Sequence, residues 1–282
     1  PEPQLCTEFA RMADEHGWSI EEYADLKDGV WVVSRSEQPA STYKDDIQNS
    51  IANVVDSSFW YRIRNHLLLQ YLDRNGISGT LWDIGSGTGV VSRALSGGGY
   101  QVVAIEPGRG GAISAAAYGV TSVSSTLEDL QLPTGSVSAI GLFDVIGHLP
   151  NSKTLLAECH RVLSPTGQLL LSVPAHTWLW SQTDVLSGHQ CRYSRRSLRT
   201  ELETSAFVIH DCSYRLASLV IPMALIRSIP WRLGYRSKQS VDQRQLAMAL
   251  PRTVTWITRL ERLFGNWSPF GTSLFACASP RQ

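Results

Sequence analysis

Between residues 79 and 174, short apolar runs alternate with segments that have helical spacing. Strands are predicted at residues 80–84, 101–106, 119–123, 136–143 and 168–174. The helical segments between them are long enough for crossovers, so the strands are predicted to pair in parallel with right-handed connections. The pattern therefore predicts an α/β protein with a doubly wound sheet, in which ligands bind at the carboxyl ends of the strands.

The flanking segments extend this core. Residues 46–74 carry apolar side chains three and four positions apart, which is typical of an amphipathic helix. Residues 208–216 and 271–279 are predicted to be two more strands. Together with the five above, they give an expected seven-stranded, mostly parallel sheet.

The remaining segments are predicted to be additions to the sheet. Residues 1–45 form an N-terminal, mainly helical extension with a short strand at 28–34, and the main domain runs over 46–282. Residues 216–267 are apolar and helical, and we expect them to be a lid or insertion before the last strand. Ser194 is a candidate N-cap for a helix that follows it.

Composition narrows the functional classes. The 282 residues carry 25 basic and 25 acidic side chains, and this balance argues against nucleic-acid binding, which needs an excess of Lys and Arg. The five cysteines are scattered without metal-ligand spacing, so no metal site is expected, and a reducing, cytoplasmic location fits them. The most apolar stretch, 216–226, contains Pro222 and is closed by Arg227, which makes it too short to cross a bilayer.

Three glycines follow the first buried strand. Gly85, Gly87 and Gly89 stand between a strand and a helix, where free backbone N–H groups and the helix dipole favour a bound ligand. A dinucleotide site wants the spacing G-x-G-x-x-G, whereas here the pattern is Asp83-x-Gly-x-Gly-x-Gly. A carboxylate at that position repels a pyrophosphate and attracts an ammonium or sulfonium. Glu106, at the end of the next strand, can accept hydrogen bonds from both hydroxyls of a ribose.

These motifs resemble those of the class I S-adenosylmethionine-dependent methyltransferases. The resemblance is carried by LWDIGSGTGVVSRAL, VVAIEP and LEDLQLPTGSVSAIGLFDVIGHLPN, and it covers roughly residues 55–215 and the last strand. A narrower resemblance, in SSFWYRIRN and the G-H-x-x-R-Y segment after 174, is to one bacterial subgroup of these enzymes. Both imply a Rossmann-like fold and S-adenosylmethionine as cofactor, with S-adenosylhomocysteine as product.

Carried over by position, the resemblance implies a set of cofactor contacts. The methionine end is lined by Asp83, Gly85, Ser86, Gly87 and Gly89, the ribose by Glu106 and Pro107, the adenine by Thr126 and Leu127, and the pocket is closed by Phe143 and Asp144. Arg64 is a candidate partner for the cofactor carboxylate. The sequence departs from the family pattern at Thr126 and Ser138, where acids are usual, and at Gly147, where Glu is common.

Candidate reacting groups follow the fourth and fifth predicted strands of the core. His148, His189 and Tyr193 are candidates for a general base or an acceptor contact. The alternatives are that His148 holds its loop and that Arg192 and Tyr193 cap the next helix or pair with Asp184. The candidate acceptor contacts are Trp60, Trp178, Trp180 and Arg192.

The sequence therefore predicts a methyltransferase that acts on a small molecule or a glycan, with O-methylation as the first choice. N-methylation, carboxyl methylation and a catalytically silent cofactor-binding module are the alternatives, and a nicotinamide oxidoreductase is disfavoured by the glycine spacing. Beyond the acceptor, the partners left open are a homodimer partner, with a monomer equally compatible, and a weak contact of the insertion with a membrane interface.

Overall fold

The computed structural model describes residues 7–33, 59–235 and 268–282. The strands are β1 (Ala24–Lys27), β2 (Val30–Val33), β3 (Leu81–Ile84), β4 (Val102–Ile105), β5 (Thr121–Ser124), β6 (Val137–Phe143), β7 (Leu163–Pro174), β8 (Phe207–Arg215) and β9 (Ser273–Pro280). The α-helices are α1 (Thr7–His16), α3 (Phe59–Arg74), α4 (Val90–Gly97), α5 (Arg109–Ala117), α6 (Lys153–Val162), α7 (Gln182–Leu186), α8 (Arg195–Thr204), α9 (Val220–Met223) and α10 (Ile229–Arg232). Short helical turns are η1 (Ile20–Glu22), η2 (Ile146–His148), η3 (Thr177–Leu179), η4 (Ala217–Leu219) and the π-helical η5 (Ala224–Ser228).

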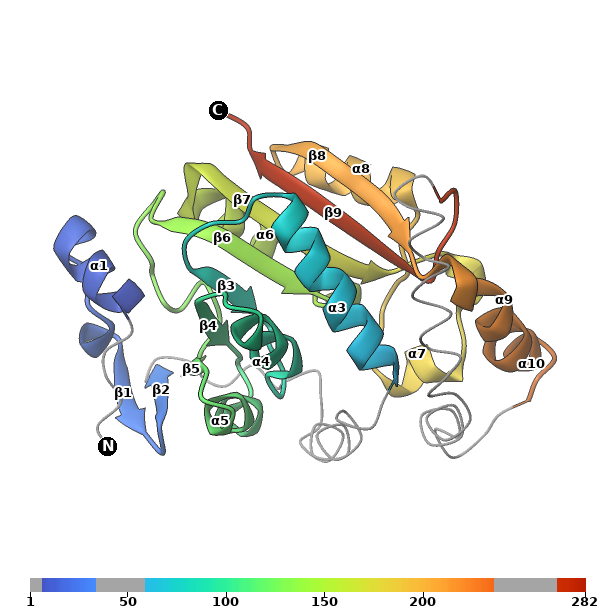
Figure 1. The fold of residues 1–282 in the computed structure, drawn as a ribbon, viewed down its shortest axis with the longest axis horizontal. Coiled ribbons are helices and arrows are strands. Elements are labelled where there is room, and N and C mark those ends of the chain that lie inside the picture. Colours follow the sequence, from blue (N-terminus) through green and yellow to red (C-terminus); the bar gives the residue numbers. More distant parts are fainter. Residues whose placement is uncertain (1–6, 34–58, 236–267) are drawn as a thin grey trace.

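The described strands form one sheet in the order β1-β2-β5-β4-β3-β6-β7-β9-β8 (Figure 1). From β2 to β7 all pairs are parallel, whereas β9 runs antiparallel to both β7 and β8. From β3 the chain proceeds to β4 and β5 on one side and to β6 and β7 on the other. The order therefore reverses between β3 and β6, and the carboxyl ends of these two strands mark the expected ligand position. The doubly wound α/β fold predicted from the sequence is confirmed.

Two hydrophobic cores cover the two faces of the sheet. On one face, α1, α6 and α8 pack through Phe9, Leu156 and Leu202 against alternate strand residues such as Trp82. On the other, α3, α4 and α5 pack through residues such as Leu68, against Leu81 and its neighbours. In Figure 1, α3 and α4 lie in front of the sheet. The alternation of strand side chains between two faces produces this layered arrangement.

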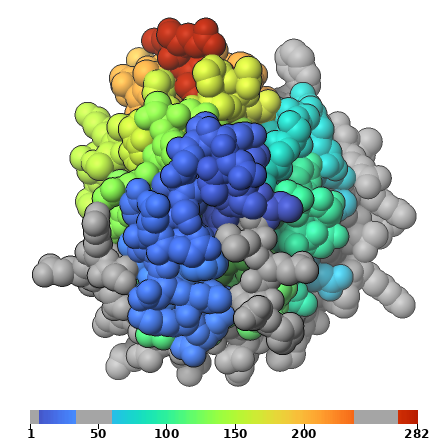
Figure 2. Space-filling view, turned by 90° about the vertical axis from the view of Figure 1, so that its left-hand side faces the viewer, coloured from blue at the N-terminus to red at the C-terminus, as the bar shows by residue number. Residues whose placement is uncertain are grey.

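The strand count differs from the expected seven because the N-terminal extension joins the sheet. Asp28 and Gly29 adopt positive φ of 53° and 76°, which closes a tight hairpin between β1 and β2. β2, predicted at 28–34, pairs with β5, and β1 was missed because it has only four residues, of which only Ala24 is buried. Phe9 packs 6.1 Å from Trp82, ring centroid to ring centroid, so the extension also covers the core. Figure 2 shows residues 7–33 spread over that end of the molecule.

The insertion is described only as far as residue 235, where η4, α9, η5 and α10 follow β8 directly. The rest of it, like the first part of the helix predicted over 46–74, lies outside the described residues. Ser194 accepts a hydrogen bond from the Ser197 N–H at 3.0 Å, which confirms the predicted cap of α8. Among the described residues, no helix is long and apolar enough to cross a membrane, and no group of His, Cys, Asp and Glu has the arrangement of a metal site.

Candidate active site at the carboxyl ends of the strands

Glycine is required at the three positions after β3 for different structural reasons. All three have positive φ, of 70°, 56° and 76° for Gly85, Gly87 and Gly89. A Cβ on Gly85 would lie 2.9 Å from Val145 Cγ2, and one on Gly89 would lie 2.6 Å from Ala115. Among the described residues, no atom lies within 4 Å of the position that a Cβ on Gly87 would take. Packing therefore accounts for the outer two glycines, whereas the bare backbone of Gly87 faces open space.

Glu106 holds this loop from the end of β4. Its carboxylate accepts the Gly87 N–H at 2.8 Å and the Gly108 N–H at 2.9 Å. The side chain is buried, and Gly111 of α5 packs so closely on Glu106 and Gly87 that a Cβ there would lie 2.7 Å from the Gly87 carbonyl oxygen. The two amides fix the orientation of this carboxylate directly after β4, at the carboxyl edge of the sheet.

Asp83, on β3 beneath the loop, is fully buried. Burial raises the pKa of its carboxyl to about 7, against the opposing effects of a hydrogen bond from Ser92 and the charge of Arg64. The charge of Glu106 raises it further. In the glycine loop, the Ser86 hydroxyl is buried and has no hydrogen-bond partner within the described part of the chain. A buried carboxyl that is poised between its two forms fits a site that receives a positive charge.

Arg64 of α3 and Asp144, which follows β6, form an ion pair at the same edge. The Arg64 side chain is only 7 % exposed, and its guanidinium lies 4.7 Å from the centroid of the Trp60 ring. Asp144 has a φ of 63°, in the left-handed region, because the chain turns sharply as it leaves the strand. Both residues were predicted to contact the cofactor, and the structure brings them together beside Asp83, whose pKa the Arg64 charge lowers.

The predicted adenine contacts follow β5. The Thr126 hydroxyl accepts the Asp129 N–H at 3.1 Å and is engaged in its own turn, while Leu127 is buried. The backbone N–H of Ser125 donates to the Glu106 carbonyl oxygen at 3.3 Å, so this turn lies against the Glu106 backbone. Phe143, predicted to close the pocket, packs over Gly141 within the core on the α3 side. Pro107 is partly exposed beside Glu106.

Two histidines from separate segments stack at this edge of the sheet. His148 lies in η2, and His189 follows α7; their ring centroids are 4.2 Å apart at an interplanar angle of 26°. The Gly147 carbonyl oxygen accepts the Gln190 N–H at 2.8 Å, which ties the two segments together. Burial and the charge of His189 lower the pKa of His148 to about 4, so this ring is neutral near pH 7.

Asp184 of α7 is the centre of a polar cluster behind this pair. Its carboxylate accepts hydrogen bonds from Arg192 Nε at 2.7 Å and Nη2 at 3.0 Å, and from the Ser181 N–H at 2.9 Å. It also lies 3.2 Å from His189 Nδ1. Burial alone would raise the pKa of Asp184, but His189 and Arg192 outweigh burial and lower it to about 2. From the sequence, Asp184 was expected only as an alternative partner of Arg192. The spacing Ser181-x-x-Asp184, which has the pattern of a capping box, is the signal that could have identified it.

Arg192 and Tyr193, both candidates for roles toward the acceptor, are buried in the scaffold. Arg192 Nη1 donates to the Ala175 carbonyl oxygen at 2.9 Å, so the guanidinium is engaged by Asp184 and the chain after β7. Tyr193 forms a backbone bridge with Ala175 and belongs to the core, and burial raises the pKa of its hydroxyl.

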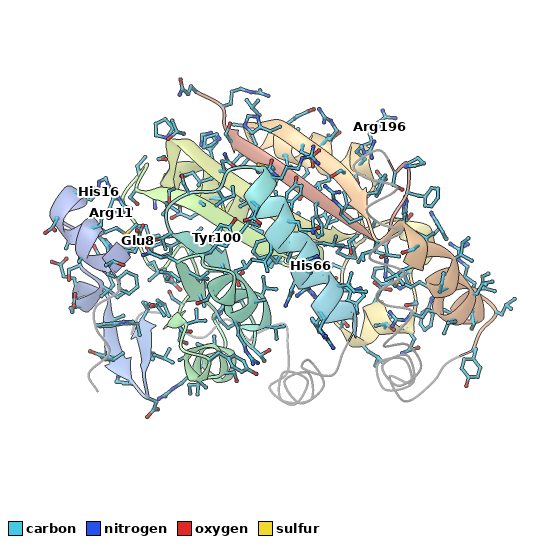
Figure 3. The ribbon with its side chains drawn as sticks, viewed as in Figure 1. Glu8, Arg11, His16, His66, Tyr100 and Arg196 are labelled. Carbon is cyan, nitrogen blue, oxygen red and sulfur yellow. The ribbon has the colours of Figure 1, made fainter. Side chains whose placement is uncertain are left out.

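An open cavity of about 790 Å³ lies next to this segment, between the starts of α6 and α8. It is lined by Leu149 and Cys191, the chain neighbours of the histidine segments, and by Tyr193, Lys153 and Arg196. Arg196 is exposed on α8, as Figure 3 shows.

The three tryptophans predicted to meet an acceptor are divided between two places. Trp178, in η3, is 42 % exposed, and Trp180 next to it is half-buried. Trp60 packs instead against a small apolar cluster formed by Ile63, Leu216 and Leu219. The first two therefore remain open to a ligand, whereas Trp60 joins α3 to the insertion.

A second polar cluster lies at the opposite ends of the strands. Arg11 pairs with Glu8 at 2.7 Å and donates to the Ser136 carbonyl oxygen, just before β6, at 2.8 Å. Figure 3 shows Glu8, Arg11 and His16 together on α1. Because these contacts join α1 to the amino ends of the strands, we interpret them as structural.

Comparisons with known proteins identify the family and the fold of the chain. Residues 59–211 match a family model described as a methyltransferase domain. A Mycolicibacterium smegmatis protein named as an S-adenosylmethionine-dependent methyltransferase is 27 % identical over 174 residues, covering 58 % of this chain and 65 % of that protein. A ubiquinone biosynthesis O-methyltransferase of Pseudomonas paraeruginosa is 28 % identical over 118 residues, covering 38 % and 50 %. The chain thus spans between half and two thirds of the length of these curated relatives.

Solved structures share the fold at low sequence identity. A SAM-dependent methyltransferase from Thermotoga maritima has a TM-score of 0.57 at 16 % identity, covering 83 % of this chain and 96 % of that one. The phosphoethanolamine N-methyltransferase 2 of Haemonchus contortus, solved with S-adenosyl-L-methionine, has a TM-score of 0.52 at 17 % identity, covering 86 % and 59 %.

Proposed function

Because the chain belongs to the methyltransferase domain family, we propose that it is an S-adenosylmethionine-dependent methyltransferase that acts on a small molecule or a glycan. The family match covers 59–211, which includes the glycine loop, Glu106 and both histidines. O-methylation is the first choice. The observation that carries the proposal is the open space above Gly87, with one buried carboxyl beneath it and another at its side.

The residues at this edge fit the cofactor. The missing side chain of Gly87 leaves room for a ligand against the backbone, and the unpartnered Ser86 hydroxyl supplies a buried hydrogen-bonding group. Asp83 offers a carboxyl that becomes charged when a cation approaches, and Arg64 offers a guanidinium for a carboxylate. Glu106, oriented by two backbone amides, would accept hydrogen bonds from the ribose hydroxyls.

S-adenosylmethionine, when bound, supplies a methyl group that is already activated by its positive sulfur. The chain therefore has three tasks: to align the acceptor with that methyl, to exclude water, and to accept a proton where the acceptor is a hydroxyl. His148 and His189 lie beyond Asp144, at the carboxyl end of β6, and either imidazole can accept a proton in its neutral form.

The acceptor side favours a hydroxyl on a ring compound. Trp178 and Trp180 offer aromatic surface, and the open cavity beside Tyr193 has room for a sugar or a phenol. The relative named for ubiquinone biosynthesis is an O-methyltransferase, which also supports oxygen as the acceptor atom. The Haemonchus contortus enzyme of the same fold is an N-methyltransferase, so a nitrogen acceptor is the second candidate.

The insertion supplies a further contact, which we propose is with a lipid–water interface. Ile221, Leu225 and Leu233 are 69 %, 60 % and 82 % exposed, and residues 216–235 contain two arginines and no acidic residue. We expect the protein to sediment with anionic phosphatidylglycerol vesicles, and the variant Leu225→Asp/Leu233→Asp to sediment less. Equal sedimentation of both proteins would remove this part of the proposal.

The test of the main proposal combines calorimetry with turnover. S-adenosylhomocysteine formation is followed with a panel of phenols, methyl glycosides, amines and carboxylates. Product with a phenol or a glycoside supports O-methylation, product with an amine or a carboxylate moves the acceptor to the alternatives, and binding of the cofactor without turnover on any compound indicates a silent module. Absence of cofactor binding refutes the proposal.

A further inference from the structure

We propose that His189 is the general base of the transfer and that Asp184 and Arg192 are its positioning residues. In this proposal, the ring of His148 stacks on His189 and holds it in place. This inference rests on the proposed function and deepens it, because it commits the acceptor to a hydroxyl that must lose its proton, such as a phenol or a sugar hydroxyl.

The first step is the tautomer of His189. Its Nδ1 lies 3.2 Å from Asp184 Oδ1, which is the distance of an ion-pair contact, although the two groups are not aligned as a hydrogen bond. A carboxylate at that distance favours a hydrogen on Nδ1, and this leaves the lone pair of a neutral imidazole on Nε2. The side chain is 16 % exposed, so it is largely enclosed without being sealed from a ligand. The carboxylate also stabilises the imidazolium that forms when Nε2 accepts a proton.

The second step is the rigidity of Asp184. Arg192 donates hydrogen bonds to both carboxylate oxygens of Asp184, from Nε at 2.7 Å and from Nη2 at 3.0 Å. The Ser181 backbone N–H donates to the same carboxylate at 2.9 Å. Arg192 is in turn fixed to the Ala175 carbonyl oxygen, just after β7. The carboxylate is thereby anchored to the carboxyl edge of the sheet, where the methyl donor is expected. Bidentate pairing of this kind fixes orientation as well as charge.

The third step concerns His148, which faces His189 at a ring distance of 4.2 Å. The groups that face the two rings are Asp184 from α7, Asp144 from the end of β6 and the Gly188 backbone, with Arg192 behind Asp184. Two imidazolium ions at this distance would repel each other. Of the two rings, His189 is the one whose Nδ1 faces the Asp184 carboxylate.

The step balances as follows. The acceptor oxygen forms a bond to the methyl carbon as the bond from that carbon to sulfur breaks, and the electrons of the broken bond remain on sulfur. The hydroxyl proton moves to His189 Nε2. The imidazolium then loses its proton to water, which restores the neutral base. No other co-reactant is needed.

The tautomer of His189 is tested first, because this measurement needs no methyl acceptor. In ¹⁵N-histidine NMR spectra of the protein with S-adenosylhomocysteine, we expect His189 to carry its hydrogen on Nδ1 near pH 8, and Asp184→Asn to shift the population away from this form. A hydrogen on Nε2 of His189 in the unaltered protein would overturn the inference, whatever the acceptor is.

The base is tested by turnover on the hydroxyl acceptor that reacts best in the panel. His189→Ala is expected to lower kcat about 10²- to 10⁴-fold without changing cofactor affinity, with partial rescue by added imidazole. Asp184→Asn is expected to lower kcat and to move the acidic limb of the pH profile to lower pH, and Asp184→Glu to restore part of the rate. His210→Ala, an exposed histidine on β8, is the matched control and should behave as the unaltered protein.

The failure of this inference is distinct from failure of the proposed function. Turnover by His189→Ala within about twofold of the unaltered protein, with an unmoved pH profile, would remove the base while the methyltransferase assignment stands. Turnover only with carboxylate acceptors, which have no proton to lose, would also overturn it. If Asp184→Asn does not fold, the partly exposed His189→Ala still decides the question.

Discussion

The substitution Gly87→Ala separates a ligand site from a tight turn. The added Cβ meets no atom of the described residues within 4 Å, so its cost to the fold is the cost of placing alanine at a φ of 56°. That cost is about 1–2 kcal/mol. For a domain of this size it corresponds to a fall of roughly 2–8 °C in Tm.

The cost to cofactor binding has a different origin. The methyl group would occupy the space in which we place the ligand, next to the amide that Glu106 holds at 2.8 Å. We expect the affinity for S-adenosylhomocysteine to fall at least tenfold, which is about 1.4 kcal/mol or more. Unlike the cost to the fold, this loss depends on a ligand being there.

Gly76 is the matched control for this experiment. It has a φ of 64°, and a Cβ there also meets nothing within 4 Å, but it follows α3 and lies away from the glycine loop. Thermal unfolding should give similar losses for Gly87→Ala and Gly76→Ala, and calorimetry should give a loss of affinity only for Gly87→Ala. Equal affinity in both variants would refute the argument that the open space above Gly87 is the ligand site.

Three further predictions concern the charges around this loop. Glu106→Gln leaves one of the two backbone amides facing an N–H donor instead of an acceptor. We therefore expect the free energy of unfolding to fall by about 1.5–3 kcal/mol and cofactor binding to weaken, with Glu203→Gln at an exposed position as the control. The pKa of Asp83 is about 7 in the folded protein and 3.8 ordinarily, so the free energy of unfolding should fall as pH rises from 4 to 7. Over the same range the carboxyl becomes charged, so the affinity for the cationic cofactor should rise through pH 7. Asp83→Asn should flatten the first dependence in denaturant titrations and the second in calorimetry. Arg64→Gln leaves the Asp144 carboxylate without its partner and should cost about 3–5 kcal/mol in denaturant unfolding, and an unchanged midpoint would mean that the pair contributes nothing.

The repeating core was predictable because its signals are local. The apolar runs of β3, β4, β6 and β7 are bounded by glycine and polar turns, and the helices between them have helical spacing. β1 escaped prediction because it is a four-residue edge strand in which only Ala24 is buried, and the sequence does not reveal that β2 would pair with β5 more than eighty residues away. Long-range pairing of this kind depends on the packed core, not on local pattern.

The sequence makes more specific predictions for the cofactor half of the candidate site than for its acceptor half. The residue types and spacing of Asp83, the glycines and Glu106 point to one ligand, whereas Arg192 was expected to face the acceptor. Its pairing with Asp184, the alternative expected from the sequence, is the arrangement found, and it depends on how the segment after β7 folds back. The stacking of His148 on His189 likewise arises from contact between segments some forty residues apart.

The most direct test of the account is a crystal structure of the full chain with S-adenosylhomocysteine. We predict that the sulfur and the methionine part lie against Gly87 and Asp83, with the ribose hydroxyls on Glu106 and the adenine beside Leu127. Density for the ligand at any other place, or none at this edge of the sheet at saturating concentration, would contradict the account.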